Sequence, residues 1–190
     1  MERLYSICGL LSSVVFLALW VAAAIFDPDW ALGKLSLSDL GSCGIASAEI
    51  CFNMGCALSG VFGIIFAVGI IGRKDMFRIV GILAMCCSIL VICIGIVDLG
   101  YGAPHRYVAT IYGLFATACM IASIYTDWKI GMKRISIFTL AMLLLCAIMM
   151  FTQTFEVFEP IAISCVMIWT ASQAIKFLMM DKNIPSMSDC

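Results

Sequence analysis

The chain has 190 residues, of which 64% are hydrophobic and 12% are charged, and its mean hydropathy is +1.12. Soluble domains are closer to half apolar and a quarter charged, so this composition excludes a soluble globular protein and indicates an integral membrane protein. The formal net charge of −1 says little about partners, because in a membrane protein the division of charge between the two faces matters most.

Six apolar runs follow one another along the chain, and each can cross a bilayer as a helix, which takes about 20 residues. The connections between them are short except for residues 27–48, so no soluble domain of ordinary size fits between the spans. The predicted fold class is therefore all-α: a polytopic bundle of six transmembrane helices over residues 1–180, with a short cytoplasmic tail at 181–190. The predicted spans are 4–26, 50–72, 79–97, 107–126, 135–155 and 160–180.

The first run, 4–26, follows Arg3 and ends near Ala22, Ala23 and Ala24, which resemble the cleavage site of a secretory signal. The apolar region of a signal peptide is shorter than this run. A retained first helix is therefore the favoured interpretation, and removal would leave the other orientations unchanged.

The second run carries small residues at intervals of four: Gly55, Ser59, Gly63 and Ala67. This spacing places them on one helical face, where small side chains let another backbone approach closely. Packing within the chain is the favoured interpretation, and a homo-oligomer interface through the same face is the alternative.

Basic residues predict the orientation, because cytoplasmic connections retain Lys and Arg. If six helices alternate in direction, both termini share one side with the second and fourth connections. That side holds Arg3, Arg73, Lys74, Arg78, Lys129, Lys133, Arg134, Lys176 and Lys182, whereas the other holds Lys34 and Arg106. Both termini are therefore predicted to be cytoplasmic in a multi-pass protein of the cell membrane, with Lys176 extending from the last span towards the interface.

The predicted outer face is acidic. It carries Asp27, Asp29, Asp39, Glu49, Asp98, Glu156 and Glu159, together with the single histidine, His105. An acidic rim is ordinary where topology removes Lys and Arg. Four of the polar residues, however, lie at or inside helix ends, where such a group is costly unless it is paired or faces water: Glu49, Asn53, Asp98 and Glu156.

The turn after Asp98 contains Gly100, Gly102 and Pro104, and it brings His105 and Arg106 to the start of the fourth span. Such a turn can return His105 or Arg106 to Asp98 in a charge-assisted hydrogen bond. The alternatives are that this contact only fixes the hairpin, or that His105 and nearby carboxylates form a polar site for a lipid headgroup or a cation.

Most of the eleven cysteines fall within apolar runs, where a free cysteine behaves as a small buried hydrophobe. Only Cys43 and Cys51 lie near the predicted outer face. A bond between them is possible in an oxidising compartment, but their spacing alone does not establish it.

Several short motifs resemble prokaryotic six-helix membrane proteins of the domain-of-unknown-function family 998. The motifs are Ser36-Leu37-Ser38-Asp39-Leu40-Gly41, Phe52-Asn53-Met54-Gly55 with Ser59-Gly60, and Gly95 to Asp98 followed by His105-Arg106 and Ala109. The chain is more distantly similar to the Frag/DRAM/Sfk membrane proteins, whose eukaryotic members are linked to lipid-anchor remodelling, lysosomes and lipid asymmetry. The resemblance implies the six-helix fold and the importance of Asp39, Asn53, Asp98 and His105, without a settled activity.

Two functional hypotheses remain. The first is a non-enzymatic protein whose outer polar cavity, lined by Asp39, Glu49, Asn53, Asp98, His105 and Arg106, binds membrane lipid or a partner helix, with Arg106 suited to a phosphate headgroup. The second is a lipid-modifying enzyme that uses His105 and Asp98 as an acid-base pair, with or without a metal.

Other functions fit the sequence less well. A zinc hydrolase needs about three protein ligands, typically histidines, and one histidine does not supply them, so no cofactor or metal is expected. A small transporter is only the third choice. A transporter normally has polar or charged groups near the middle of the bilayer, and the middles of the six runs carry no charge. No nucleic-acid partner is expected, since topology already explains the basic connections.

Overall fold

The computed structural model describes residues 2–73 and 75–182. The described chain forms six long helices, each long and apolar enough to cross a membrane, and two short 3-10 turns, so the predicted all-α bundle of six membrane-spanning helices is confirmed. The elements in order are α1 (Glu2–Phe26), η1 (Ser38–Gly41), α2 (Ala46–Ile71), α3 (Asp75–Ile96), η2 (Leu99–Tyr101), α4 (Ala103–Lys129), α5 (Lys133–Thr152) and α6 (Phe155–Lys182).

The helices mostly extend beyond the apolar runs, because a polar residue at the interface continues a helix as readily as an apolar one. α4, for example, begins at Ala103 and ends at Lys129, a turn beyond its apolar run at each end. The prediction that Pro160 begins the last helix is wrong, since α6 begins at Phe155. Proline has no N–H, so within α6 the carbonyl of Glu156 loses one helical hydrogen bond near the helix end.

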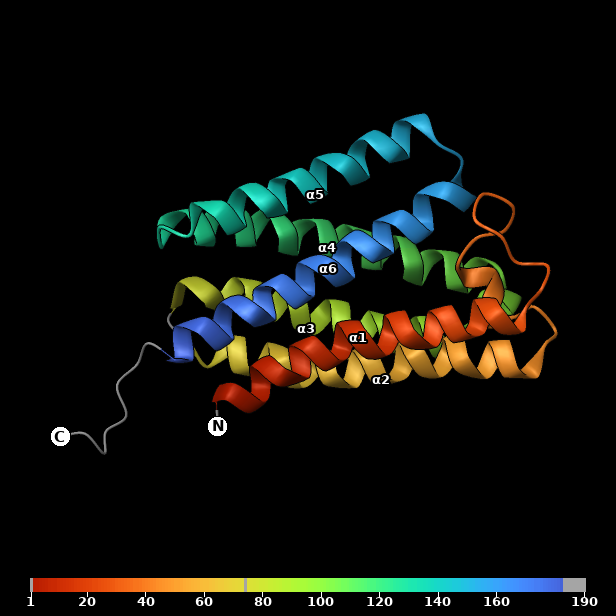
Figure 1. The fold of residues 1–190 in the computed structure, drawn as a ribbon, viewed down its shortest axis with the longest axis horizontal. Coiled ribbons are helices and arrows are strands. Elements are labelled where there is room, and N and C mark those ends of the chain that lie inside the picture. Colours follow the sequence, from red (N-terminus) through yellow and green to blue (C-terminus); the bar gives the residue numbers. More distant parts are fainter. Residues whose placement is uncertain (1, 74, 183–190) are drawn as a thin grey trace.

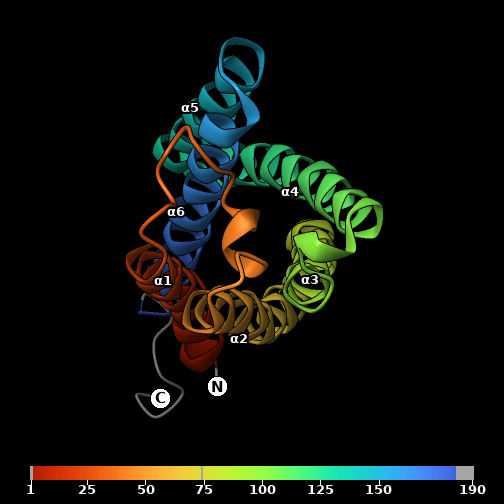
Figure 2. The ribbon, with the colours of Figure 1, turned by 90° about the vertical axis from the view of Figure 1, so that its right-hand side faces the viewer.

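The six helices form a closed ring (Figure 2). Each helix contacts the next one in sequence, and α6 packs back against α1. α2 is the most enclosed, with 44% of its membrane span buried, whereas α5 has 11% buried and lies at one edge of the bundle (Figure 1). α2 is therefore the central packing element, and α5 is the least buried of the six helices.

The small residues of α2 lie against its two neighbours. Ser59 Oγ lies 3.1 Å from Ser12 Oγ of α1, whose hydroxyl also donates to the Ser59 carbonyl at 2.9 Å. A Cβ at Gly55 would lie 3.2 Å from Leu19 of α1, and one at Gly63 would lie 2.5 Å from Ser88 Oγ of α3. Each of these contacts lies within the chain, so this face of α2 is occupied by intramolecular packing.

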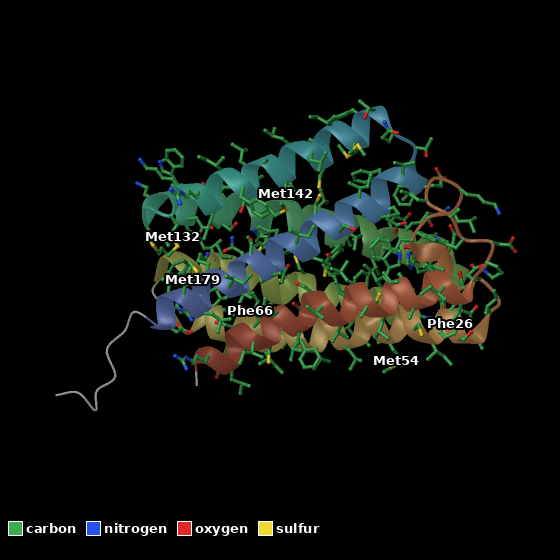
Figure 3. The ribbon with its side chains drawn as sticks, viewed as in Figure 1. Phe26, Met54, Phe66, Met132, Met142 and Met179 are labelled. Carbon is green, nitrogen blue, oxygen red and sulfur yellow. The ribbon has the colours of Figure 1, made fainter. Side chains whose placement is uncertain are left out.

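Both ends of the described chain lie at one end of the ring, together with the α2–α3 and α4–α5 connections (Figure 1). We call this the termini end. The opposite end, which carries residues 27–45 and the turn around η2, is the loop end. Between them, apolar side chains cover the outside, as Phe26, Met54 and Met179 show, while Phe66 is buried (Figure 3).

Candidate functional sites at the two ends of the ring

At the loop end, the segment containing η1 lies across the middle of the ring of helices (Figure 2). Its Leu37 and Leu40 are almost fully buried and join a hydrophobic cluster with Phe16, Phe52 and other core residues. Burial of two leucines draws the segment down between the helices. We call residues 36–41 the covering segment, because they close the loop end of the bundle.

Glu159 of α6 anchors the covering segment. Its Oε2 accepts the backbone N–H of Leu37 at 2.7 Å, and its Oε1 accepts the Ser38 hydroxyl at 2.6 Å. Hydrogen bonds to a charged group are about twice as strong as neutral ones. The indole N–H of Trp30 adds a bond to the Ser36 carbonyl at 2.9 Å. The sequence suggested an acidic rim residue at Glu159, whereas the structure gives it a specific partner.

Three of the predicted site residues form hydrogen bonds that stabilise the local backbone at the loop end. Asp39 Oδ2 accepts both the N–H and the hydroxyl of Ser36, at 2.6 and 2.7 Å. Glu49 Oε1 accepts the N–H of Gly44 at 2.7 Å, and Asn53 Nδ2 donates to the Gly41 carbonyl at 3.1 Å. In the part of the chain that the structure describes, the amide oxygen, Asn53 Oδ1, is buried without a hydrogen-bond partner.

Within the described residues, Asp98 does not form the hydrogen bond to His105 or Arg106 that the turn allows. Asp98 Oδ1 instead accepts the N–H of Gly100 at 2.9 Å. His105 is 2% exposed, and its Nδ1 lies 2.7 Å from the Val97 carbonyl. Gly102 turns the chain between Val97 and His105 with φ +69°, a conformation that favours glycine, and the Gly102 carbonyl accepts the backbone N–H of Arg106. The Arg106 side chain is exposed.

The six predicted ligand-binding residues therefore share the loop end, where five of them are hydrogen-bonded to separate nearby groups. Glu49 and Asn53 line a common groove, which lies between the loop-side ends of α2 and α3. In residues 2–73 and 75–182, no three His, Cys, Asp or Glu side chains come together as metal ligands would. Among the described residues, Cys43 and Cys51 form no disulfide.

At the termini end, the structure contains a buried polar cluster that the sequence analysis missed. Lys176 Nζ donates to Asp127 Oδ1 at 2.7 Å, and Gln173 Nε2 donates to Asp127 Oδ2 at 3.1 Å. Lys176 also donates to Gln173 Oε1. The exposed fractions of Asp127, Lys176 and Gln173 are 0%, 1% and 2%. The prediction that Lys176 extends to the interface is wrong, because its partner lies inside the bundle.

Aromatic rings surround the ammonium group of this cluster. Lys176 Nζ lies 4.3 Å from the centroid of the Phe177 ring and 5.5 Å from that of Phe77. The Arg73 guanidinium lies over the same Phe177 ring at 4.4 Å and forms an ion pair with Asp181 at 2.8 Å. Cation–π attraction partly replaces the hydration that a buried cation loses.

A cavity of about 60 Å³ lies inside the ring, between α1, α2, α3, α4 and α6. Its polar wall consists of Ser12, Ser59, Ser88, Tyr112, Thr170 and Gln173. Gln173 thus belongs both to the cavity wall and to the Asp127 cluster. In the sequence, the only sign of this arrangement was a glutamine and a lysine three residues apart in an otherwise apolar run.

Neither the curated proteins nor the solved structures gave a significant match to the chain. A family model described as "Protein of unknown function (DUF998)" matches residues 10–176, which include all of α2 to α5 and most of α1 and α6. Because this match covers most of the chain, the protein belongs to the DUF998 family, and its six apolar helices make it a multi-pass membrane protein.

Proposed function

We propose that the protein is a non-enzymatic lipid-binding membrane protein, and that the lipid lies in the groove between the loop-side ends of α2 and α3. The observation that supports this most is the composition of the groove. It has a volume of about 410 Å³ and is lined by Glu49, Ile50, Asn53, Met54, Ala57, Gly95 and Ile96. Polar groups occupy the end nearest the interface, and apolar side chains continue along the membrane span, as a lipid requires.

The groove is accessible from the side of the bundle. Ile50, Met54 and Ile96 are 63%, 48% and 66% exposed, and Figure 3 shows Met54 on the outer surface of α2. Gly95 allows close approach of α3 to α2, since a Cβ there would lie 2.7 Å from the Asn53 carbonyl oxygen. The floor of the groove is therefore backbone and small side chains, which leaves room for an acyl chain.

Glu49 favours a lipid whose headgroup carries an ammonium group. It lies in the first turn of α2, and within the described residues the hydrogen bond from Gly44 N–H to Oε1 is the only one to its carboxylate. A carboxylate at this level attracts an ammonium group and repels an anionic headgroup. Phosphatidylethanolamine fits this chemistry. The exposed Arg106 provides a positive charge for a phosphate elsewhere at the same end.

The enzymatic alternative has weaker support. The proposed acid-base pair of His105 and Asp98 is not formed, and His105 is bonded to a backbone carbonyl. A general base must reach its substrate within hydrogen-bond distance.

We also propose that the termini end faces the cytoplasm, because nine of the eleven Lys and Arg residues belong to that side.

Native mass spectrometry of the protein from nanodiscs tests the lipid proposal, with phosphatidylethanolamine or phosphatidylglycerol as the bilayer lipid. Glu49→Gln should weaken retention of phosphatidylethanolamine about tenfold, since a hydrogen bond to a charged group contributes about 1.5 kcal/mol. Met54→Trp should fill the groove and weaken retention of both lipids.

The matched control is Leu144→Trp, which places the same indole on the lipid-exposed surface of α5, where Leu144 is 53% exposed. It should retain lipid as the unaltered protein does. Equal retention by Glu49→Gln and the unaltered protein would contradict the proposed headgroup contact. Dimers that dissociate on Met54→Trp would instead assign the groove to a second copy of the chain.

A further inference from the structure

Exposed cations gather at the connection between α4 and α5, at the termini end. Lys129 ends α4, and Lys133 and Arg134 begin α5. All three side chains are exposed. Gly131 turns the chain with φ +83°, and a Cβ there would meet no atom within 4 Å. We call residues 129–134 the basic turn; Met132 marks its place in Figure 3.

No carboxylate that the structure describes offsets the charge of the basic turn. Two aspartates at the termini end have described side chains, and each is buried with a cation of its own. Asp127 pairs with Lys176, and Asp181 pairs with Arg73. The three cations of the basic turn form no ion pair within residues 2–73 and 75–182. Positive charge therefore accumulates there without a counter-charge from the described chain.

The orientation rule explains why basic residues occur at this end, and the exposed Arg3 and Arg78 share it. It does not explain why Lys133 and Arg134 occupy the first turn of α5, which holds no acidic residue. The positive end of the helix dipole makes a cation unfavourable at that place. The two cations therefore do not serve the stability of α5 itself.

Two aromatic rings place the basic turn at the level of lipid headgroups. Lys129 Nζ lies 5.6 Å from the centroid of the Tyr125 ring, and Lys133 Nζ lies 5.4 Å from that of Trp128. Both rings are more than half exposed, at 62% and 52%. Tyrosine and tryptophan with exposed rings prefer the boundary between membrane and water. The cations above these rings are therefore within the headgroup region.

An apolar face continues from the basic turn along α5. Lys133, Ile137 and Leu140 follow one another at intervals of four and three residues, so they lie on one face of the helix. Ile137 and Leu140 are 57% and 42% exposed. A positive charge at the interface followed by an exposed apolar stripe is complementary to a lipid with a negative headgroup and an acyl chain.

We propose that the basic turn binds the headgroup of an anionic phospholipid of the phosphatidylglycerol type, with an acyl chain along the exposed face of α5. The guanidinium of Arg134 suits the phosphate, because it donates two parallel hydrogen bonds to phosphate oxygens. A zwitterionic lipid is bound less well, since the same cations repel its ammonium group. The site lies at the opposite end from the α2–α3 groove and does not depend on it.

A lipid titration of the full-length protein tests the proposal. The protein is placed in phosphatidylcholine nanodiscs that contain rising fractions of phosphatidylglycerol, and native mass spectrometry counts the bound phosphatidylglycerol. In Lys133→Gln/Arg134→Gln, the half-saturating fraction should rise at least about tenfold, because each cation near an anionic headgroup changes the affinity about fivefold. Added salt should release phosphatidylglycerol from the unaltered protein, since it screens exposed charges.

Two variants serve as matched controls. Arg3→Gln/Arg78→Gln removes the same number of charges from α1 and α3 at the same end, and it should change the half-saturating fraction by less than about twofold. Lys133→Arg/Arg134→Lys exchanges the two cations and should keep most of the binding, which separates loss of charge from misfolding.

Three results would overturn the proposal. Equal titrations of the unaltered protein and Lys133→Gln/Arg134→Gln would exclude the lipid and leave an acidic protein segment as the occupant of the basic turn. Equal weakening by Arg3→Gln/Arg78→Gln would assign the binding to the charge of the whole end. A loss in the exchange variant as large as in Lys133→Gln/Arg134→Gln would show that charge at the basic turn is not the cause.

Discussion

The two ends of the ring use polar side chains in different ways. At the loop end, carboxylates accept backbone and hydroxyl groups of nearby loops, as Asp39 does from Ser36 and Glu159 does from Leu37. At the termini end, charged side chains from different helices bond to one another inside the bundle, as Lys176 of α6 does to Asp127 of α4. The first arrangement fixes the shape of the covering segment. The second keeps two opposite charges buried side by side, so that removal of one leaves the other buried without a counter-ion.

The largest predicted effect is therefore at the termini end. Lys176→Met should lower the free energy of unfolding by about 3–5 kcal/mol, because it leaves Asp127 buried without its counter-ion. Equilibrium unfolding in mixed micelles measures this change. Lys34→Met is the control, since both contacts of Lys34 with Asp29, an ion pair and a hydrogen bond to the backbone carbonyl, are exposed. Equal losses in the two variants would contradict the difference between the ends.

The anchor of the covering segment should have a smaller and more local effect. Glu159→Gln weakens the bonds to Leu37 and Ser38, and about 2 kcal/mol of local stability should be lost, as for hydrogen bonds to charged groups. Hydrogen exchange should become faster in residues 36–41 and stay unchanged in α3. Glu156→Gln, on the same turn of α6, is the comparison variant. Unchanged exchange in residues 36–41 would contradict the anchoring role.

The α2–α3 contact between the two ends provides a third test. Gly60→Ala should destabilise the protein by about 1–3 kcal/mol, since the new Cβ would lie 2.6 Å from the Ser88 carbonyl oxygen. Gly113→Ala is the same substitution at a position where the new Cβ would meet no atom within 4 Å. It should be neutral or stabilise the protein by up to about 1 kcal/mol. Thermal unfolding of both variants measures the difference. If Gly113→Ala destabilises the protein more than Gly60→Ala does, α2 and α3 pack less closely than the structure indicates.

The smallest predicted effect is at the exposed edge of the loop end. Lys34 Nζ lies 3.9 Å from Asp29 Oδ1, and both side chains are exposed. Lys34→Ala should change the free energy of unfolding by less than about 0.5 kcal/mol. A loss above about 1 kcal/mol in equilibrium unfolding would show that this pair matters more than exposed pairs generally do.

The sequence predicted the parts of the fold that depend on short-range patterns. Six apolar runs were enough for six helices, and alternation of direction placed Asp39 and His105 at the same end of the ring. Helix bounds were less accurate, because Glu156 and Glu159 interrupt the apolar pattern before Pro160, although α6 begins at Phe155. Interface residues continue helices whether or not they are apolar.

The contacts of the candidate sites were harder to predict, since they join residues far apart in the chain. Glu159 and Ser38 are 121 positions apart, and Asp127 and Lys176 are 49 apart. Such pairs depend on which helix faces meet, and the spacing of residues within one helix does not contain that information. Local turns were also misjudged, because Asp98 bonds to Gly100 two residues away and not to His105.

A double-mutant cycle on Asp127 and Lys176 tests most directly that the termini end depends on a coupled buried pair. Asp127→Asn, Lys176→Gln and the double variant are compared by their free energies of unfolding. The predicted result is a double variant more stable than either single variant, with a coupling energy of at least about 2 kcal/mol. Additive losses, with a coupling energy near zero, would contradict it.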